Sequence, residues 1–307
     1  MFLALFGLAT STAVAADDDA VKGAFAERHA DEVAGLVVVS TLLSVAALPL
    51  LLAALLVTTL FGCEDWIDDV EPKASISSEV ALTSRAGFEA LIISGYDRLQ
   101  QTNWYGQYFV LAPDALADNA VNTTPHTNRY LATVSNTRGA HFGIWASAYA
   151  NINEMNNVIA KIDALQLTLA NAQQVKDNIK GQAYFLRALA YFDLARTYGY
   201  EPGREVAGWN AGVILRTEPT EGVEDADFRA RATNAEVYNL VKDDLNQAAT
   251  LLAGSGNTKN RATQAGALAL LSRVNLYTGD FAAAEAAATA ALAASTATLV
   301  NDNGGGQ

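Results

Sequence analysis

Apolar residues in this chain recur every three to four positions, which is the spacing of one face of an α-helix. No stretch shows the sustained alternation of apolar and polar residues that is typical of a strand. We therefore predict an all-α fold. The expected helices cover residues 84–101, 145–161, 174–198 and 233–252, and a helical hairpin follows over residues 263–294.

Residues suited to helix ends mark several of these boundaries. Ser84 and Thr263 are plausible N-caps, because a hydroxyl oxygen can accept a hydrogen bond from a free backbone N–H group. Thr233 and Glu236 have the spacing of a capping box. A Gly-Asp pair at residues 279–280 divides the hairpin, whose small residues and Gly-Asp-aromatic turn resemble a tetratricopeptide repeat.

Three side-chain roles can be predicted from these patterns. The third helix is apolar on two sides, so Tyr184, Tyr191 and Tyr198 are expected to pack between helices. Asn156 lies on the apolar stripe of the second helix, where we expect its amide to hydrogen-bond a neighbouring loop. Trp209, in the loop after the third helix, is either a stacking platform or a lid over the helices, and we favour the lid.

An uncharged apolar run over residues 35–62 ends directly before the only cysteine of the chain, Cys63, and acidic residues follow. This junction resembles the lipobox of bacterial lipoproteins, where the signal peptide is cut before a cysteine whose thiol is acylated. The run is also long enough for an uncleaved transmembrane helix. Residues 1–16 form a second signal-like segment, which indicates a translation start further downstream. We expect an export region over residues 1–62 and an exported domain over residues 63–307.

The composition excludes several classes of function. With 33 acidic and 20 basic residues, the chain has a net charge of −13 at pH 7, which disfavours nucleic-acid binding. Its three histidines lack the spacing of a zinc site, and no phosphate-binding loop or hydrolase motif occurs. A glycosidase needs a carboxylate pair held across a sugar, and nothing in the sequence isolates such a pair. We expect no metal, no cofactor and no enzymatic activity.

An irregular stretch rich in aromatic and amide side chains is expected over residues 103–143, between the first two helices. A structureless connection of that length is usually functional or disordered. Sugar binding needs an aromatic plane for the apolar ring face, and amides, carboxylates or arginine for the hydroxyl groups. This stretch supplies all of them. The candidate ligand-binding residues are Asp118, Asn119, Asn128, Arg129 and Tyr130.

Several segments together resemble the SusD/RagB family of outer-membrane nutrient-binding lipoproteins. They follow one another in the order of that family: LFGCEDWIDD, a first helix ending in GYDRLQ, WASAYANINEMNNVIAKI, KGQAYFLRALAYFDLARTYG and the closing hairpin. The likeness covers nearly all of residues 63–294.

The resemblance implies a tetratricopeptide scaffold with a lipid anchor in the outer membrane, facing the exterior. It also implies a non-enzymatic role, in which glycans or other nutrients are held over a SusC-like TonB-dependent transporter. Family members continue well beyond the hairpin, so we expect a chain truncated at its C-terminus. The alternative is a tetratricopeptide scaffold for protein–protein interaction in the cell envelope. The stretch over residues 103–143 favours nutrient binding, since a plain repeat array does not need it.

Overall fold

The chain divides into two compact units, Met1–Ala74 and Ser75–Gln307. The computed structural model describes residues 35, 38–47 and 49 of the first unit, and residues 82–123, 129–137, 142–222, 228–255 and 260–297 of the second. In this described part of the chain, no helix combines the length and the apolar character needed to cross a membrane. Cys63, the expected lipidation site, and most of the apolar run before it lie outside the described residues.

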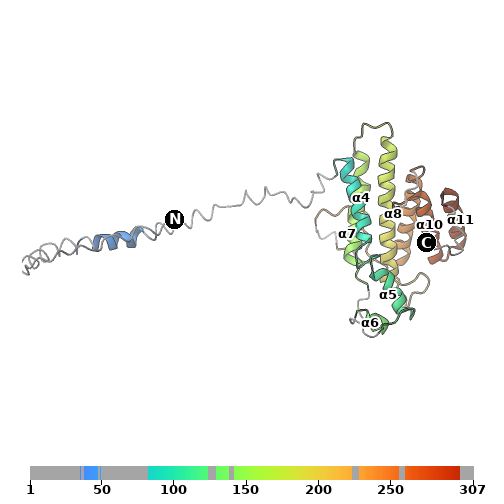
Figure 1. Cartoon of the computed structure of the whole chain (residues 1–307), viewed down its shortest axis with the longest axis horizontal. Helices are drawn as coiled ribbons and strands as arrows, with labels where there is room; N and C mark the ends of the chain where they lie inside the picture. The colour runs from blue at the N-terminus through green and yellow to red at the C-terminus, as the bar shows by residue number, and fades with distance from the viewer. Residues whose placement is uncertain are drawn as a thin grey trace, which may run out of the picture. The chain divides into compact units, whose positions relative to one another are not determined.

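The described part of the second unit is helical (Figure 1), which confirms the predicted all-α fold. In chain order the helices are α4 (Arg85–Leu99), α5 (Tyr108–Leu116), α6 (Leu131–Val134), α7 (Trp145–Lys161), the 3-10 helix η1 (Ile162–Ala164), α8 (Ala172–Tyr198), α9 (Asn234–Leu251), α10 (Gln264–Tyr277) and α11 (Phe281–Ala294). The β-type pairing found among the described residues is an isolated antiparallel bridge between Ala211 and Thr233.

The helix ends form where the sequence predicts them. The hydroxyl oxygens of Ser84 and Thr263 each accept a hydrogen bond from a first-turn backbone N–H group, both at 3.1 Å. Thr233 and Glu236 form the complete capping box, with each side chain bonded to the backbone of the other residue. At the hairpin turn the chain takes a left-handed conformation (φ +73°), which glycine at position 279 adopts without strain.

The long helices pack in series. α8 packs against α7 and α9, and α10 packs against α9 and α11. α4 packs against both α7 and α8, whereas the short helices α5 and α6 lie together at one end of this array (Figure 1). Such nearest-neighbour packing is typical of helical repeats.

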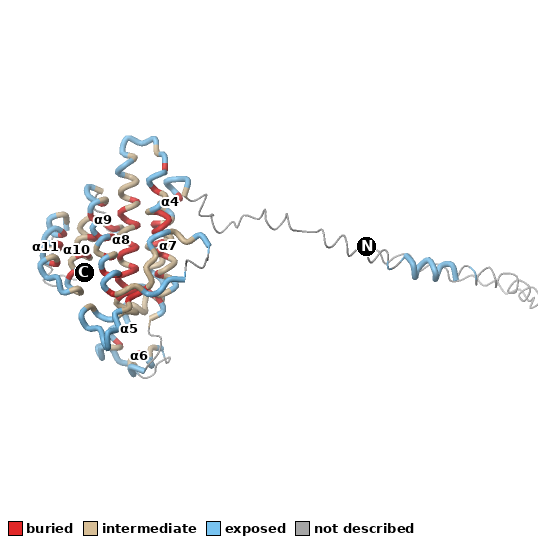
Figure 2. Tube along the Cα trace, turned by 180° about the vertical axis from the view of Figure 1, so that it is seen from behind, coloured by how far each residue is buried: buried red, intermediate tan, exposed pale blue. Residues whose placement is uncertain are grey.

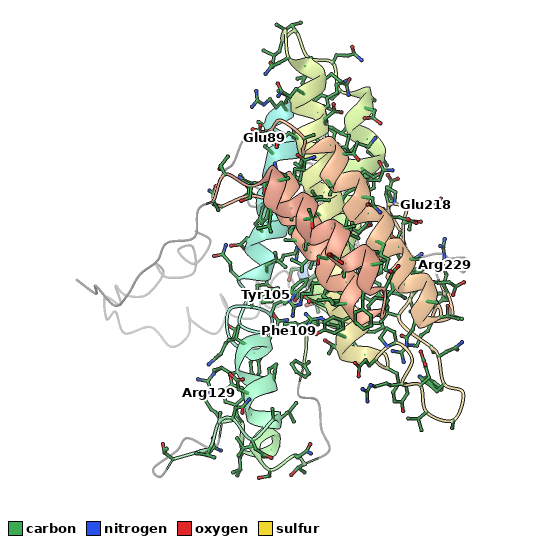
Figure 3. All side chains as sticks on the ribbon, turned by 90° about the vertical axis from the view of Figure 1, so that its right-hand side faces the viewer. Glu89, Tyr105, Phe109, Arg129, Glu218 and Arg229 are labelled. Atoms are coloured by element: carbon green, nitrogen blue, oxygen red, sulfur yellow. The ribbon has the colours of Figure 1, made fainter. Side chains whose placement is uncertain are left out.

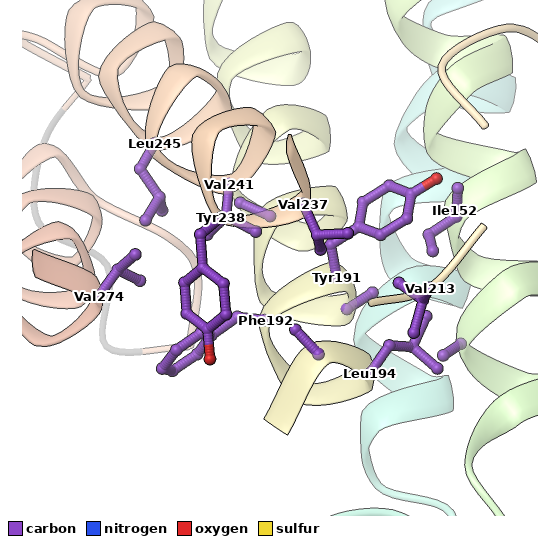
Figure 4. Packing of buried hydrophobic residues seen from close by; sticks show 14 of the residues in the cluster. Ile152, Tyr191, Phe192, Leu194, Val213, Val237, Tyr238, Val241, Leu245 and Val274 are labelled. Carbon is purple, nitrogen blue, oxygen red and sulfur yellow. The ribbon is translucent and has the colours of Figure 1, made fainter. Parts of the chain in front are cut away.

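The core is built around α8, whose central part is buried (Figure 2). Tyr191 and Phe192 are fully buried and pack with residues of α7, α9 and α10 (Figure 4). Burial raises the pKa of Tyr191 to about 12, and its hydroxyl donates to the backbone oxygen of Arg216 at 2.8 Å. Tyr184 and Tyr198 pack at the edges of apolar clusters. The predicted packing role of the three tyrosines is therefore confirmed.

A buried ion pair joins α8 to α9. The Arg187 guanidinium donates two hydrogen bonds to the Asp244 carboxylate, at 2.7 and 2.8 Å, and the two side chains are 6% and 3% exposed. Arg187 also donates to Asn156 Oδ1 at 2.8 Å. Asn156 Nδ2 in turn donates to the backbone oxygens of Arg216 and Glu218, each at 3.0 Å. The amide of Asn156 thus binds a neighbouring loop, as predicted, and the network connects three helices.

Two expectations for the connections were wrong. The stretch over residues 103–143 is not wholly irregular, because α5 and α6 form within it. α5 has only nine residues and contains Pro113, which lacks a backbone N–H and usually ends a helix, so its periodicity was obscured. Trp209 is 52% exposed and does not pack on any of the apolar clusters of the described residues, so it does not form the expected lid over the helices.

The final hairpin depends on a close approach of α10 and α11. Ala284 is 4% exposed, and its backbone oxygen accepts a hydrogen bond from Ser272 Oγ at 2.8 Å. We expect Ala284→Phe to overpack this contact and to lower the free energy of unfolding by about 1–3 kcal/mol. Urea denaturation followed by circular dichroism measures the change. Ala286→Phe, on the exposed side of α11, is the matched control. Equal midpoints for the two variants would contradict the helix contact.

Candidate functional site

One buried carboxylate attaches the segment before α5 to α8. Asp193 of α8 is fully buried, and its Oδ2 accepts hydrogen bonds from Trp104 Nε1 at 2.8 Å and from the Tyr105 hydroxyl at 2.7 Å. Its Oδ1 accepts from the Arg196 guanidinium, which also stacks over Phe109, 5.4 Å from the ring centre. These contacts hold the beginning of α5 in a fixed position on the helical array.

The electrostatics of this attachment keep its donors protonated. Burial raises the pKa of Asp193, and the Arg196 charge and the hydrogen bonds from Tyr105, Trp104 and Arg196 oppose that effect. Burial and the adjacent Asp193 carboxylate raise the pKa of Tyr105, so its hydroxyl remains a donor at every physiological pH. The donors therefore keep their protons, whereas the raised pKa of Asp193 makes its carboxylate the group of this attachment that acid affects first.

Arg129, which lies farther from the long helices than Tyr105 and Phe109 (Figure 3), belongs to a group of partly exposed side chains at the beginnings of α5 and α6. We call Gln107, Tyr108, Arg129 and Tyr130 the α5–α6 cluster. Arg129 donates a hydrogen bond to Gln107 Oε1 at 3.2 Å, and its guanidinium lies 5.9 Å from the centre of the Tyr130 ring. The rings of Tyr108 and Tyr130 meet edge to face, with centres 5.2 Å apart. Two aromatic rings, an amide and a guanidinium are thus presented together.

Tyr130 has an unusual backbone and an unusual hydroxyl. It begins α6 in the left-handed region (φ 60°), which costs a residue other than glycine about 1–3 kcal/mol. Its hydroxyl oxygen is buried without a hydrogen-bond partner among the described residues, and burial raises its pKa. Backbone strain is often found at functional sites, so these two features make Tyr130 a candidate for ligand contact.

The predicted site residues that the structure describes lie in two places, after α5 and before α6. Arg129 and Tyr130 lie in contact. Asp118 and Asn119 are exposed in the turn after α5, where Asp118 also has a left-handed backbone (φ 60°). Asn128 lies outside the described residues.

Sequence reasoning missed Gln107 and Tyr108 as members of the cluster. The sequence signal was an amide and an aromatic residue at the start of a segment already expected to bind ligand. Their contact with residues about 20 positions later depends on how the chain returns, which local pattern does not show.

The chemistry of the α5–α6 cluster suits a neutral, hydroxyl-rich ligand. An aromatic face can stack on the apolar face of a sugar ring, while amide and guanidinium groups bond hydroxyl oxygens. Within the described residues, no group of three histidine, cysteine or acidic side chains is arranged to hold a metal ion.

Comparison with known sequences finds two curated relatives, and both are SusD-like proteins. It is 28% identical over 250 residues to SusD-like protein P38 of Formosa agariphila, a match covering 78% of this chain and 44% of that protein. It is 27% identical over 232 residues to SusD-like protein P2 of the same organism, covering 74% of this chain and 42% of that protein. The chain thus spans less than half the length of these curated relatives.

Solved structures share the fold. A SusD-like carbohydrate-binding protein from Bacteroides vulgatus superposes with a TM-score of 0.60 at 23% identity, over 71% of this chain and 46% of that one. A SusD superfamily protein from Bacteroides thetaiotaomicron gives a TM-score of 0.57 at 23% identity, over 68% and 46% of the two chains.

A family model described as starch-binding and associating with the outer membrane matches residues 65–276. Since this match includes most of the chain, the chain belongs to the SusD-like family.

Proposed function

We propose that this chain is part of a non-enzymatic surface lipoprotein that binds glycans, with the α5–α6 cluster as part of its binding site. The observation that carries the proposal is the contact of Gln107 and Tyr108, at the beginning of α5, with Arg129 and Tyr130, at the beginning of α6. The segment before α5 is attached to the core through Asp193. Asp118, Asn119 and Asn128, from the same connection, complete the proposed site. The starch-binding description of the family supports glycan binding as the function.

We further propose that the bound glycan is delivered to a SusC-like TonB-dependent transporter. The protein would be held at the outer membrane by lipid on Cys63 and would face the exterior. The family's association with the outer membrane supports the location. A single acyl chain gives only marginal membrane binding, so more than one chain is expected on the anchor.

The anchor is tested on the protein extracted from membranes. We expect mass spectrometry to find a mature N-terminus at Cys63, with a mass increase that corresponds to acylation. Cys63→Ser should shift the protein to the soluble fraction or leave the apolar run uncleaved. An intact chain that begins at Met1 and carries a free thiol would contradict lipidation.

The binding site is tested by calorimetry of the purified full chain against a panel of oligosaccharides. We expect Tyr130→Ala to weaken binding by about 1–3 kcal/mol, roughly 5- to 150-fold, because a well-desolvated aromatic contact is lost. Tyr130→Phe keeps the ring and should retain most of the affinity. Tyr200→Ala removes a tyrosine that is 40% exposed in another loop and serves as the matched control.

Two results would contradict the proposal. If Tyr130→Ala and Arg129→Ala together leave the affinity unchanged, the α5–α6 cluster is not the site, and Trp209 becomes the next aromatic residue to test. Release of shorter sugars by the purified chain would contradict the non-enzymatic role. The same calorimetry samples, analysed for products, provide this second measurement.

A further inference from the structure

A separate cleft of about 520 Å³ lies between the first half of α4, the first half of α8 and the segment that leads into α10. We call it the α4–α8 cleft. Glu89 lies on its wall, far from Arg129 of the α5–α6 cluster (Figure 3). The glycan-binding proposal does not use this cleft.

One wall of the cleft is a stripe of amide side chains along α8 and its N-cap residue: Asn171, Gln174, Asn178 and Gln182. Steps of three and four residues put these side chains on one face of the helix. At about 1.5 Å per residue the stripe is roughly 16 Å long, which is the length of about five residues of extended peptide. Its dimensions therefore match a short extended segment.

Part of the stripe is already oriented by internal hydrogen bonds. Gln182 Nε2 donates to Asn178 Oδ1 at 2.6 Å, and the Tyr96 hydroxyl donates to Gln182 Oε1 at 3.3 Å. A carboxamide has two N–H donors and an oxygen that accepts two bonds, so these side chains retain capacity for a ligand. A peptide group likewise offers one donor and one acceptor, and a row of amides can exchange both kinds of bond with it.

The other walls favour a peptide over a sugar. The apolar lining is aliphatic, with Ile92 and Ile93 on α4 and Val175 and Ile179 on α8, and none of the described residues that line the cleft is aromatic. Sugar rings are usually bound on aromatic planes. In an extended peptide, alternate side chains point to opposite faces, so one set can pack on the aliphatic wall. Ile93 is 52% exposed and offers such apolar surface.

The charges of the cleft favour an acidic ligand. Arg85 pairs with Glu89 at 2.8 Å, whereas Arg261 forms no ion pair with a carboxylate of the described residues. The Arg261 guanidinium lies over the Tyr96 ring, 5.1 Å from its centre, and this contact orients it. A guanidinium in this position can bind a carboxylate through two hydrogen bonds. The positive charge contrasts with the net charge of −13 of the whole chain.

From these observations we propose that the α4–α8 cleft binds an extended peptide segment of about five residues. The amide stripe of α8 bonds the peptide backbone, alternate aliphatic side chains of the peptide pack on Ile93 and Val175, and Arg261 binds one carboxylate of the peptide.

Fluorescence anisotropy of the full chain with labelled hexapeptide libraries tests the proposal. The acidic library has valine or isoleucine at alternate positions and glutamate at one position between them, and the neutral library has glutamine in place of that glutamate. We expect the acidic library to bind about tenfold more tightly, since one charge-assisted pair is gained. Arg261→Gln should abolish this difference, whereas Arg229→Gln, at an exposed site far from the cleft (Figure 3), should preserve it.

The amide stripe is tested by the double variant Gln174→Ala with Asn178→Ala. It should weaken binding of both libraries by about tenfold, because backbone bonds are lost whatever the side chains of the peptide. Gln173→Ala removes an exposed amide one position away and should have no effect. Melting curves show whether the double variant folds. If it does not fold, the single variant Arg261→Gln still tests the cleft.

Three results would overturn the proposal. They are the absence of binding by either library, affinities that do not change in the Arg261 and double variants, and displacement of the peptide by maltohexaose, which would make the cleft a sugar site. Tyr130→Ala should leave peptide binding unchanged. A failure of the glycan proposal can therefore be distinguished from a failure of this one.

Discussion

Asp244→Ala should lower the free energy of unfolding by about 3–5 kcal/mol, the largest effect that we expect from any single substitution in this chain. The variant would leave the Arg187 guanidinium buried between α8 and α9 without its carboxylate partner. Removal of one member of a buried ion pair costs far more than the pair itself contributes, because an uncompensated charge stays in the interior. Asn156 accepts only one of the bonds of Arg187 and cannot compensate for the loss.

Urea denaturation of the full chain, followed by circular dichroism, measures this effect. Asp243→Ala is the matched control, since the same residue type is exposed one position away. The double variant Arg187→Met with Asp244→Leu should recover much of the loss, because an apolar pair of similar volume avoids the desolvation of charge. Equal denaturation midpoints for Asp244→Ala and Asp243→Ala would show that the pair does not stabilise the fold.

Asp193→Ala should cost about 2–5 kcal/mol and should also weaken glycan binding, since it removes the acceptor that attaches the beginning of α5 to α8. Trp104 Nε1 and the Tyr105 hydroxyl would lose their partner, and Arg196 would lose its counter-charge. Each buried donor without a partner costs about 1–3 kcal/mol, and a charged group costs more. The α5–α6 cluster would then be held less firmly in its binding geometry.

The same denaturation measurement and the glycan calorimetry together test this coupling. Asp193→Asn keeps the shape of the side chain and one acceptor oxygen, so we expect a smaller loss of both stability and affinity than for alanine. Tyr105→Phe removes one donor and leaves the carboxylate, and should be milder still. If Asp193→Ala destabilises the fold and leaves glycan affinity intact, the cluster keeps its geometry without this attachment.

The helices that the sequence predicts well are those whose signals are local. α7 begins and ends where periodicity places it, and Ser84 and Thr233 cap α4 and α9 as expected, because capping involves residues only three positions apart. α5 was missed, since a nine-residue helix with an internal proline has too few turns to show a period. A longer helix shows more turns of the periodic pattern, so its existence and its ends are easier to predict from the sequence.

The partners of buried polar groups could not be predicted in the same way. Asn156 was expected to bond a loop because it lies on an apolar stripe, yet its contact with Arg187, 31 residues away, appears only in the folded chain. The attachment of Trp104 to Asp193 spans 89 residues. The amide stripe of α8 is visible in the sequence, but polar residues at helical spacing usually indicate a solvated face. The sequence around the stripe does not show that α4 forms the opposite wall of a cleft.

The serial packing of the long helices has a consequence for how the domain opens. α11 packs chiefly against α10, whereas α8 is held by α7, α9 and α4. In arrays that interact mainly with their neighbours, the free energy of each opening step is a local quantity. α8 should therefore stay closed while helices with fewer packed neighbours open. Slow amide exchange should accordingly be concentrated in the middle of the array.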